Sequence, residues 1–406
     1  MGFDEAVTLK EIDKAARQCK KSVSDKDAPI DWYCHSLTKS KKLRDDILSG
    51  RYKVRPGHEV QILRPKYRIA TAPYFRDRVW QRSMCNNGIY EDLTRGFIRE
   101  NIACQKGKGL DMAIRIIIEF LQELHRMDPG ATIYVKHWDI KKFFPSTPQR
   151  EIKKHDAKVI TEPRFIPYLT EIIDSGKDSR AKDEIEADPF GKRGTGLGSQ
   201  INQLHQVALI DPIDHELKNF CKYYIRYNDD FLVLDHDKEI IMRAETVICN
   251  RLEEFGLTMT CKGGITTAQK GFEFCRKRFY IKKSGKIIVR LHKKALADER
   301  KALRHLKRKL DAGEVDMEHI KCHYQSVIAN FEYAGDAPIR AMDKFYTVLF
   351  RQHPEYKRSR RYLYGRPHNH FLEGTSTQSG TGERKAQGGA GKDESNSGLQ
   401  HYDGQH

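Results

Sequence analysis

Residues 223–234 read YYIRYNDDFLVL, and this stretch decides the fold. Two runs of aromatic and β-branched residues, 223–227 and 231–234, flank the Asn-Asp-Asp at 228–230. Such runs separated by Asn and Asp predict two strands joined by a tight turn. Adjacent carboxylates at the tip repel each other unless a cation lies beside them, and Mg²⁺ is the natural candidate because it prefers carboxylate oxygens. Taken alone, an Asp-Asp turn is usually a polar turn exposed to water, so the rest of the chain has to decide between the two interpretations.

The composition limits the class of protein. Lys and Arg outnumber Asp and Glu by 73 to 56 in 406 residues, which gives a net charge of +17. This excess favours a partner with a phosphate backbone, although a merely basic soluble protein has the same property. Charged residues make up 32% of the chain and the mean hydropathy is −0.70, so an integral membrane protein is excluded and no membrane partner is expected.

Targeting and redox features are sparse. The N-terminal residues show no basic segment followed by an apolar run, so no secretory signal is expected. The nine cysteines are scattered and include no Cys-x-x-Cys pair. This pattern predicts reduced thiols in a cytoplasmic protein and no zinc site.

The N-terminal third predicts helices followed by a basic segment. Residues 1–50 have helical patterning, and Thr8 to Glu11 has the spacing of a capping box. Residues 64–82 interleave Arg and Lys with Tyr, Phe and Trp, as expected of a surface that grips phosphates and stacks on bases. A solvated basic face with core aromatics is the alternative interpretation.

Two further features precede the hairpin. Residues 133–140 predict a strand with an acid, Asp139, at its end, and the glycine-rich turn at 194–200 opens a predicted helix at 201–220. In this order, the three features allow Asp139, Asp229 and Asp230 to meet around two cations. Phosphoryl transfer needs such an arrangement, because two metals ~3.5–4 Å apart activate the attacking hydroxyl and neutralise the leaving pyrophosphate.

The C-terminal third predicts helices and then a tail. Residues 293–311 form a basic helix with a leucine stripe, and its charged face is suited either to a nucleic-acid backbone or to solvent. Residues 371–406 are rich in Gly, Ser, Thr and Gln with almost no apolar side chains, which predicts disorder.

These motifs resemble those of reverse transcriptases. Residues 138–146 (WDIKKFFPS) are similar to motif A, and Tyr227-Asn228-Asp229-Asp230 matches the Tyr-x-Asp-Asp of motif C. Residues 194–203 lie where motif B is found, and 272–280 is similar to the primer-grip hairpin. The segment 64–68 (RPKYR) looks like the fingers of bacterial enzymes, most similar to those of diversity-generating retroelements and group II-like elements.

The resemblance implies an α+β right-hand polymerase with fingers, a palm of antiparallel sheet plus helices, and a helical thumb. The implied segments are listed in chain order: an N-terminal helical extension at 1–45, fingers and palm at 46–290, a thumb at 291–350, and a basic, then disordered, tail at 351–406.

The family also implies roles for single residues. Asp139, Asp229 and Asp230 would hold two Mg²⁺ ions, for which Mn²⁺ can substitute, with the Ile140 carbonyl as a further ligand. Phe144 matches the position of a ring that blocks a ribose 2′-hydroxyl and so selects deoxynucleotides; a core aromatic would look the same.

Further nucleotide contacts are implied at the fingers and at motifs B and D. Arg68 would hold the triphosphate, and Lys262 occupies the place of a motif D lysine, although an ordinary surface lysine would look the same. In motif B, Leu197-Gly198 replaces the common Gln-Gly, and Gln203 matches the retroelement pattern, whereas Asn202 replaces its Ser.

The sequence therefore predicts an RNA-directed DNA polymerase of a bacterial retroelement. Because Leu197 replaces the common Gln of motif B, error-prone copying is an alternative that stays open. Its expected partners are an RNA template, a DNA or RNA primer, dNTPs and an accessory protein. A defence-associated reverse transcriptase that makes DNA with or without a template is an alternative, as is a non-catalytic RNA-binding scaffold. An RNA-dependent RNA polymerase is disfavoured by Tyr227 and Phe144.

Overall fold

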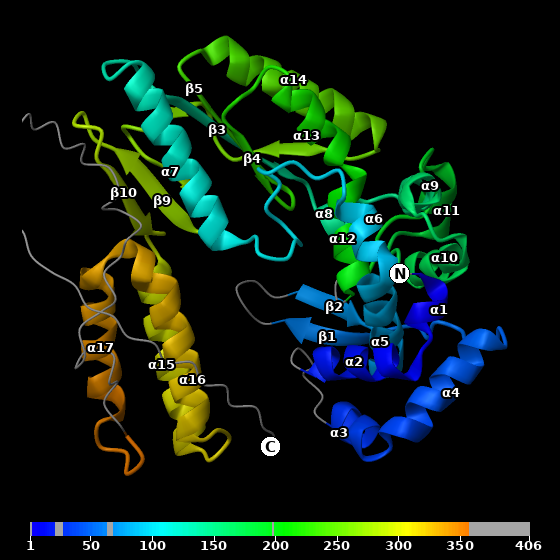
Figure 1. Ribbon diagram of the computed structural model, residues 1–406. Helices are drawn as coiled ribbons and strands as arrows, with labels where there is room; N and C mark the ends of the chain where they lie inside the picture. The colour runs from blue at the N-terminus through cyan, green and yellow to red at the C-terminus, as the bar shows by residue number, and fades with distance from the viewer. Residues whose placement is uncertain (1, 21–26, 63–67, 197–198, 357–406) are drawn as a thin grey trace, which may run out of the picture. The chain divides into compact units, whose positions relative to one another are not determined.

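The computed structural model describes residues 2–20, 27–62, 68–196 and 199–356 (Figure 1). The chain divides into two units, Met1–Leu349 and Phe350–His406, and the elements below belong to the first except for the last residue of α17. The tail predicted to be disordered, 371–406, lies outside the described residues.

An antiparallel sheet carries the predicted hairpin. Its order is β4-β5-β3-β6, and β7 also pairs with β3. The strands are β3 (Tyr134–Ile140), β4 (Tyr224–Tyr227), β5 (Asp230–Asp235), β6 (Met259–Cys261) and β7 (Thr266–Thr267). The strands on either side of the Asn-Asp turn are therefore β4 and β5, as the sequence predicts.

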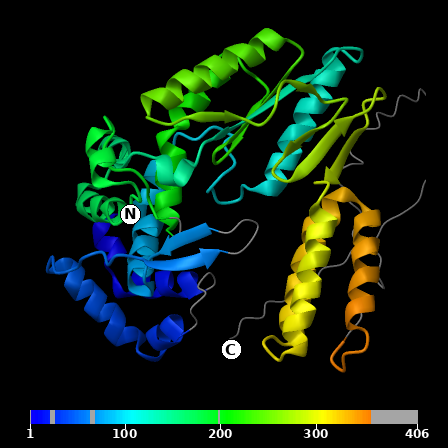
Figure 2. The same cartoon turned by 180° about the vertical axis from the view of Figure 1, so that it is seen from behind.

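Both faces of this sheet are buried, which explains why the four residues between the terminal acids of β5 are all apolar. Successive side chains of a strand point to opposite faces. Leu232 and Leu234 join one core, with α7 (Leu110–Met127), whereas Phe231 and Val233 join another, with α14 (Lys238–Glu254). The two helices consequently cover opposite faces of the sheet (Figures 1 and 2). A shift of one residue in β5 would exchange the two cores, so the register of the hairpin is firmly set.

Two smaller antiparallel sheets lie outside the central one. β1 (His58–Ile62) pairs with β2 (Arg68–Ala72). The other sheet has the order β10-β9-β8, and its strands are β8 (Phe272–Phe274), β9 (Lys277–Ile281) and β10 (Ile287–Leu291). Phe272 and Phe279 stack in this second sheet, with ring centroids 5.4 Å apart.

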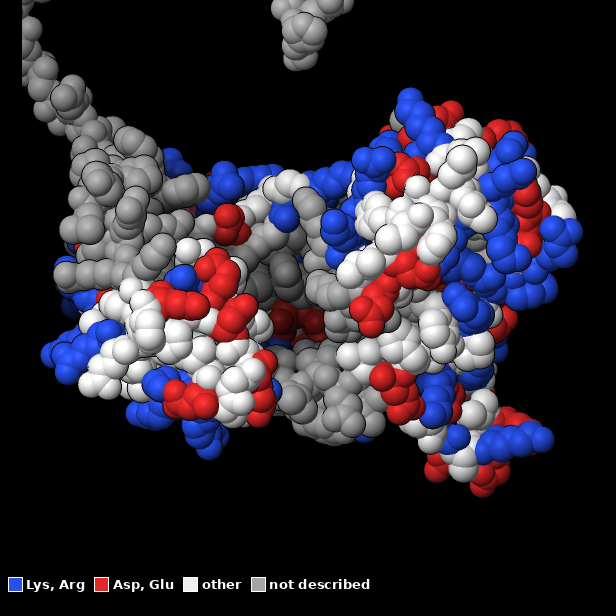
Figure 3. All heavy atoms as spheres, turned by 90° about the horizontal axis from the view of Figure 1, so that it is seen from below, with Lys and Arg blue, Asp and Glu red and all other residues white. Residues whose placement is uncertain are grey.

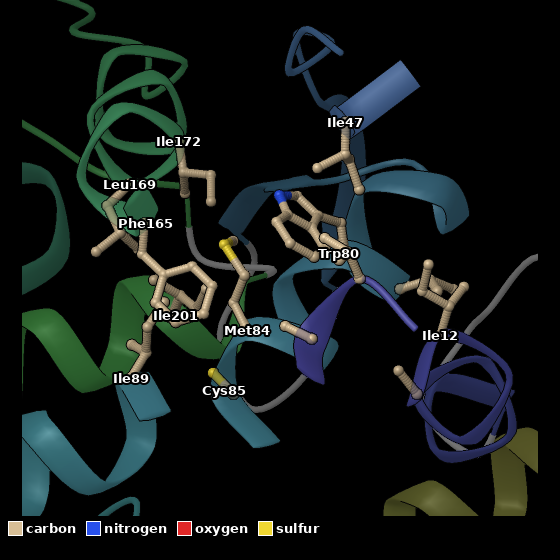
Figure 4. Packing of buried hydrophobic residues seen from close by; sticks show 14 of the residues in the cluster. Ile12, Ile47, Trp80, Met84, Cys85, Ile89, Phe165, Leu169, Ile172 and Ile201 are labelled. Carbon is tan, nitrogen blue, oxygen red and sulfur yellow. The ribbon is translucent and has the colours of Figure 1, made fainter. Parts of the chain in front are cut away.

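The N-terminal helices share one core around Trp80 (Figure 4). Ile12, Met84 and Phe165 pack there together with other apolar side chains from segments distant in sequence. The contributing elements are α1 (Phe3–Ala6), α2 (Leu9–Cys19), α3 (Asp27–Cys34), α4 (Ser36–Leu48), α5 (Phe75–Met84), η2 (Cys85–Ile89), α6 (Tyr90–Thr94), η3 (Pro163–Phe165), α10 (Ile166–Asp174) and α12 (Gln200–Leu209).

The remaining helices precede or follow the strands. They are α8 (Phe143–Ser146), α9 (Gln149–Val159), α11 (Lys182–Ala187), α13 (Asp211–Lys218), α15 (Ala295–Asp311), α16 (Met317–Phe331), η4 (Glu332–Ala334) and α17 (Asp336–Phe350). The side chain of Lys277 in β9 donates to the carbonyl of Asn330 near the end of α16, which joins the second sheet to the C-terminal helices.

The predicted α+β class with antiparallel sheet is confirmed, and two local expectations need correction. The helix expected at 201–220 is two helices, because Pro212 lies in the first turn of α13. Proline has no amide hydrogen, so it cannot continue α12, but it is tolerated in the first turn of a helix, where amide hydrogens have no partner within the helix. The capping box at Thr8 is half formed: Thr8 Oγ1 accepts from the Glu11 amide at 3.3 Å, but the Glu11 carboxylate accepts from Lys14.

The four-segment division of the chain stays a prediction. Within the described residues, no helix has both the length and the apolar character needed to cross a membrane.

Candidate active site

The tip of the β4–β5 hairpin is a two-residue turn. Tyr227 pairs with Asp230, which leaves Asn228 and Asp229 between the strands. Asn228 has a φ of 53°, in the left-handed region that Asn tolerates better than most residues because its short side chain bonds locally. Its Oδ1 accepts a weak hydrogen bond from Cys104 Sγ at 3.7 Å. Sequence therefore accounts for both the turn and its unusual backbone.

The three predicted acids meet because β3 runs antiparallel to β5. Asp139 lies directly opposite Asp230, and the Ile140 amide donates to the carbonyl of Asp229 at 3.2 Å. The side chains of Asp139 and Asp230 are 29% and 23% exposed, so a ligand can reach both. The end of β3 and the hairpin tip thus form one acidic cluster.

Within the cluster, Asp139 and Asp229 need a proton or a cation between them. Burial, followed by the hydrogen bond and the charge of Asp139, raises the pKa of Asp229 to about 7. That hydrogen bond exists only while one acid is protonated. When both are ionised, the buried Asp139 Oδ1 has no donor among the described residues.

Asp230 is held in the opposite state. Its burial acts to raise its pKa, but hydrogen bonds from His137 and Lys262 outweigh burial and lower the pKa. His137 Nε2 lies 3.0 Å from Asp230 Oδ1, and its ring packs edge-on against Phe274 with centroids 5.4 Å apart. Asp230 is therefore ionised at neutral pH.

Lys262 lies between two of the acids. Its Nζ is 3.1 Å from Asp139 Oδ2 and also contacts Asp230 Oδ1. Burial opposes the charge of Lys262, yet its hydrogen bond with Asp230 raises its pKa above the ordinary value. The ammonium thus occupies the place of a cation, and a metal that bridges these oxygens would require it to move.

The donor set fits a hard divalent cation such as Mg²⁺. It offers carboxylate oxygens, an orphaned buried Asp139 Oδ1, and a position already taken by a positive charge. Within the described ranges, no three or more His, Cys, Asp and Glu side chains are arranged as a metal site. Lys262 contacts oxygens of both Asp139 and Asp230, so these oxygens are paired with the ammonium.

Phe144 follows the cluster on α8, half-buried, with its ring 5.7 Å from that of Phe143. Its carbonyl accepts from the Thr195 amide at 3.4 Å and from Gln206 Nε2 at 3.3 Å. Gln206 Nε2 also donates to Thr195 Oγ1 at 2.6 Å, so this buried amide ties the glycine-rich segment to Phe144. Sequence reasoning missed Gln206, because only its burial distinguishes it from a surface residue.

The other predicted nucleotide contacts are only partly visible. Leu197 and Gly198 lie outside the described residues, as does the side chain of Arg68. The backbone of Arg68, in β2, pairs with that of Ile62 in β1. Gln203 is half-buried in α12, and its backbone amide donates to the carbonyl of Ser199 at 3.4 Å. Neighbouring Asn202 is buried and donates to the Gly196 carbonyl at 2.9 Å, which explains a structural role for this departure from the family pattern.

Arg226 and Asp214 support the hairpin from inside the protein. Both side chains are fully buried, and the Arg226 guanidinium pairs with both Asp214 oxygens. Arg226 also donates to the carbonyls of Asn228 at 3.0 Å and Val207 at 3.2 Å. Arg226 stands in the quoted stretch, but its role could not be read there, because Arg226 lies in β4 and its partner Asp214 lies in helix α13.

A cavity of about 760 Å³ opens beside Asp230. Cys275 and Arg276 form its β8–β9 turn, with φ values of 47° and 61°, a strained choice for residues other than Gly or Asn. Its principal polar lining is His137, Asp230, Lys262, Glu273, Arg276, Arg278, His292 and Lys293.

Positive charge is spread over the surface as well. Lys and Arg are interspersed with Asp and Glu on the face displayed in Figure 3. The net charge of +17 is therefore not expressed there as one uniform basic surface. Local clusters have to be identified residue by residue.

No family model and no curated protein matches this chain. Solved structures that share part of the fold include the telomerase of Candida albicans in complex with a TWJ fragment of telomeric RNA, with a TM-score of 0.43, 10% identity and coverage of 75% of this chain and 61% of that one. Apo telomerase from Candida tropicalis matches with a TM-score of 0.41, 12% identity and coverage of 78% and 66%.

A form of the Candida tropicalis enzyme truncated from its C-terminal domain matches with a TM-score of 0.40, 11% identity and coverage of 61% and 59%. This chain thus covers 61% of the length of the Candida albicans structure and 59% of that of the truncated Candida tropicalis structure.

Proposed function

We propose that the chain is an RNA-directed DNA polymerase that adds deoxynucleotides to a primer 3′-hydroxyl. One observation carries the proposal: Asp139 at the end of β3 meets Asp229 and Asp230 at the tip of the β4–β5 hairpin. The Tyr-x-Asp-Asp sequence of that tip, and the order of the motifs along the chain, favour the reverse transcriptase class.

Asp139, Asp229 and Asp230, with the carbonyl of Ile140, would hold two Mg²⁺ ions, for which Mn²⁺ can substitute. When bound, such ions activate a hydroxyl nucleophile and neutralise charge on the transferred phosphoryl group. The raised pKa of Asp229 supports this assignment, because burial and the neighbouring Asp139 raise it, and a cation would stabilise the ionised form against both.

The chain's own residues would supply position and selectivity. Phe144 would exclude a 2′-hydroxyl, and Gln206 holds the backbone of Phe144 through its carbonyl. Lys262, once displaced from the acids, would carry a positive charge beside the phosphates. Arg68 and the 197–198 segment are further proposed nucleotide contacts.

The proposed substrates are an RNA template, a DNA or RNA primer and dNTPs, and we place the enzyme among bacterial retroelement proteins on its motifs. An error-prone copying mode, an accessory protein partner and a cytoplasmic location belong to the same proposal. The fingers, palm and thumb would correspond to 46–290 and 291–350, after an extension at 1–45.

The test is incorporation of labelled dTTP on poly(rA)·oligo(dT) by the purified chain in Mg²⁺ or Mn²⁺. Activity is expected in the native protein and absent from Asp229→Asn/Asp230→Asn, while Asp183→Asn, which changes an exposed acid of α11, should retain it. Incorporation that persists in the double variant would refute the assignment.

A native protein that binds RNA without incorporating any nucleotide would instead identify the scaffold alternative. Sequencing of the product separates templated synthesis from the defence-type alternative, since untemplated DNA has no complement in the supplied RNA.

A further inference from the structure

A basic depression lies between α2 and α5, formed by side chains that the proposed polymerase chemistry does not use. Its volume is about 560 Å³. The lining consists only of charged and polar residues, namely Lys10, Asp13, Lys14, Arg17, Gln18 and Arg82. Four cations face one carboxylate, and none of the acids of the candidate active site is among them.

The arrangement follows from how α2 packs. Ile12, Ala15, Ala16 and Cys19 are buried in the N-terminal core, which turns the opposite side of the helix to solvent. Lys10, Lys14 and Arg17 then share that exposed side, because residues three and four apart lie above one another on a helix. Arg82 of α5, whose guanidinium lies beside Cys19, closes the depression from the second helix.

The spacing of the three cations on α2 suits a polymer of phosphates. At ~1.5 Å rise per residue, the stripe from Lys10 to Arg17 is ~10 Å long. One nucleic-acid strand carries a phosphate about every 3.4 Å of rise, so a stripe of this length covers roughly three phosphates.

Two of these cations are already held in place by acidic partners. Lys14 Nζ lies 2.9 Å from Glu11, and Arg17 Nε lies 2.8 Å from Asp13. Lys10 has no ion pair with any described residue. The Arg17–Asp13 pair is exposed, and such pairs contribute only ~0–1 kcal/mol, so exchanging Asp13 for a phosphate costs little. The Glu11 carboxylate is buried, but the Lys14 side chain is 54% exposed and can contact a phosphate while it keeps this partner. The pairs orient the side chains without blocking them.

We propose that this depression binds the sugar-phosphate backbone of single-stranded nucleic acid, and so gives the chain an RNA contact separate from the acidic cluster. The inference rests on the proposed function for the identity of the polymer as RNA. The depression is too small for a duplex, and it has no aromatic lining on which bases could stack, so the contact is independent of sequence.

An acidic protein partner is disfavoured by the same lining. Specific protein interfaces have a centre that is enriched in aromatic residues and depleted of charge, whereas the lining of the depression has no aromatic residue and five charged ones.

The experiment measures binding of fluorescein-labelled 20-mer oligo(rU) to the full chain by fluorescence anisotropy from 50 to 300 mM KCl. The variant Lys10→Gln/Lys14→Gln/Arg17→Gln should bind about tenfold more weakly at the lowest salt. The slope of log affinity against log salt should fall by about 2, since each lost phosphate contact on a single strand contributes ~0.7.

A matched control removes the same charge from another helix. Lys153→Gln/Lys154→Gln/Lys158→Gln on α9 also breaks two ion pairs, those of Lys153 with Asp174 and of Lys154 with Glu151. The control should keep the native slope. Equal slopes in the α2 variant and the native chain would overturn the proposal, and so would equal losses in both variants.

Two more measurements make the outcome specific. Polyglutamate, or vesicles containing phosphatidylserine, should displace the RNA no better from the native chain than from the α2 variant; selective displacement from the native chain would assign the depression to an acidic protein or to a membrane. Asp229→Asn/Asp230→Asn should keep the native salt slope, so loss of polymerase activity and loss of this contact are separable. A melting temperature close to native confirms that the α2 variant is folded.

Discussion

Arg226 Nη1 donates a hydrogen bond of 3.0 Å to the carbonyl oxygen of Asn228, the residue that starts the turn bearing Asp229. The guanidinium that makes this bond is fully buried and paired with Asp214, which also accepts from the Tyr224 hydroxyl. A buried, fully hydrogen-bonded charge pair thus lies directly behind the acidic cluster. Its geometry determines where the turn is held.

We expect Arg226→Met to destabilise the protein by ~3–5 kcal/mol, because Asp214 is then left buried without its cation. Urea unfolding measures this loss, with Arg126→Met on the exposed end of α7 as the control that should change little. Arg226→Met/Asp214→Leu should regain much of the stability, because no lone charge remains.

The double variant should nevertheless stay poor in dNTP incorporation, because it lacks the bond to the Asn228 carbonyl. Recovery of activity together with stability would show that the pair supports only the fold.

Asp229 should make the metal-free protein less stable as the pH rises from about 4 to 7, against the opposite effect of His205, whose pKa is lowered by burial. The pKa of Asp229 is raised to about 7 in the folded chain, whereas an unfolded Asp titrates near ~4. Between these values Asp229 holds a proton in the folded state that it has released in the unfolded chain. The free energy of unfolding therefore falls as the pH increases. The lowered pKa of Asp230 acts in the opposite sense, and only below this window.

Urea unfolding in EDTA at pH 5 and pH 7 tests the prediction. Asp229→Asn should flatten the difference between the two values, because an amide does not titrate. An unchanged pH dependence in this variant would mean that another group is responsible.

Lys262→Met should bind Mn²⁺ more tightly than the native chain does, by about tenfold or more. The ammonium contacts Asp139 and Asp230, so its removal takes away both a competitor for their oxygens and a like charge beside the metal. Isothermal titration calorimetry gives the affinities, and Lys270→Met, an exposed lysine beyond β7, serves as the control. Weaker binding in Lys262→Met would argue that the lysine organises the acids for the metal rather than competing with it.

Phe144→Ala should raise the use of rNTPs relative to dNTPs. The ring is only half-buried, so it is available to a nucleotide, and its loss should raise the rNTP-to-dNTP ratio of kcat/KM by an order of magnitude or more. Steady-state incorporation of each nucleotide on the same primer and template measures this ratio. A uniform fall in both values, with the ratio unchanged, would assign Phe144 to packing.

The sequence was informative where chemistry and local pattern coincide. Runs of aromatic and β-branched residues on either side of Asn228 predicted the hairpin, and an acid at the end of a predicted strand predicted Asp139; both patterns act over a few residues.

Contacts between distant segments could not be predicted in this way. Gln206 and Asp214 are polar helix residues whose roles depend on what faces them across the core, and no short-range pattern records that. The same holds for Lys262, whose place between two acids is fixed by the pairing of β6 with β3. Pro212, by contrast, was a visible signal for the break between α12 and α13 that the helical periodicity outweighed.

The pairing of β3 with strands that follow much later has a consequence for synthesis of the chain. His137 and Asp230 are 93 residues apart, and Lys262 follows Asp230 by a further 32. A nascent chain that ends before β5 therefore exposes β3 with both edges unpaired, and one that ends before Lys262 gathers the acids without their counter-charge. The ribosome must deliver about two thirds of these 406 residues before Lys262 can reach the acids, which makes β3 the segment most dependent on protection during translation.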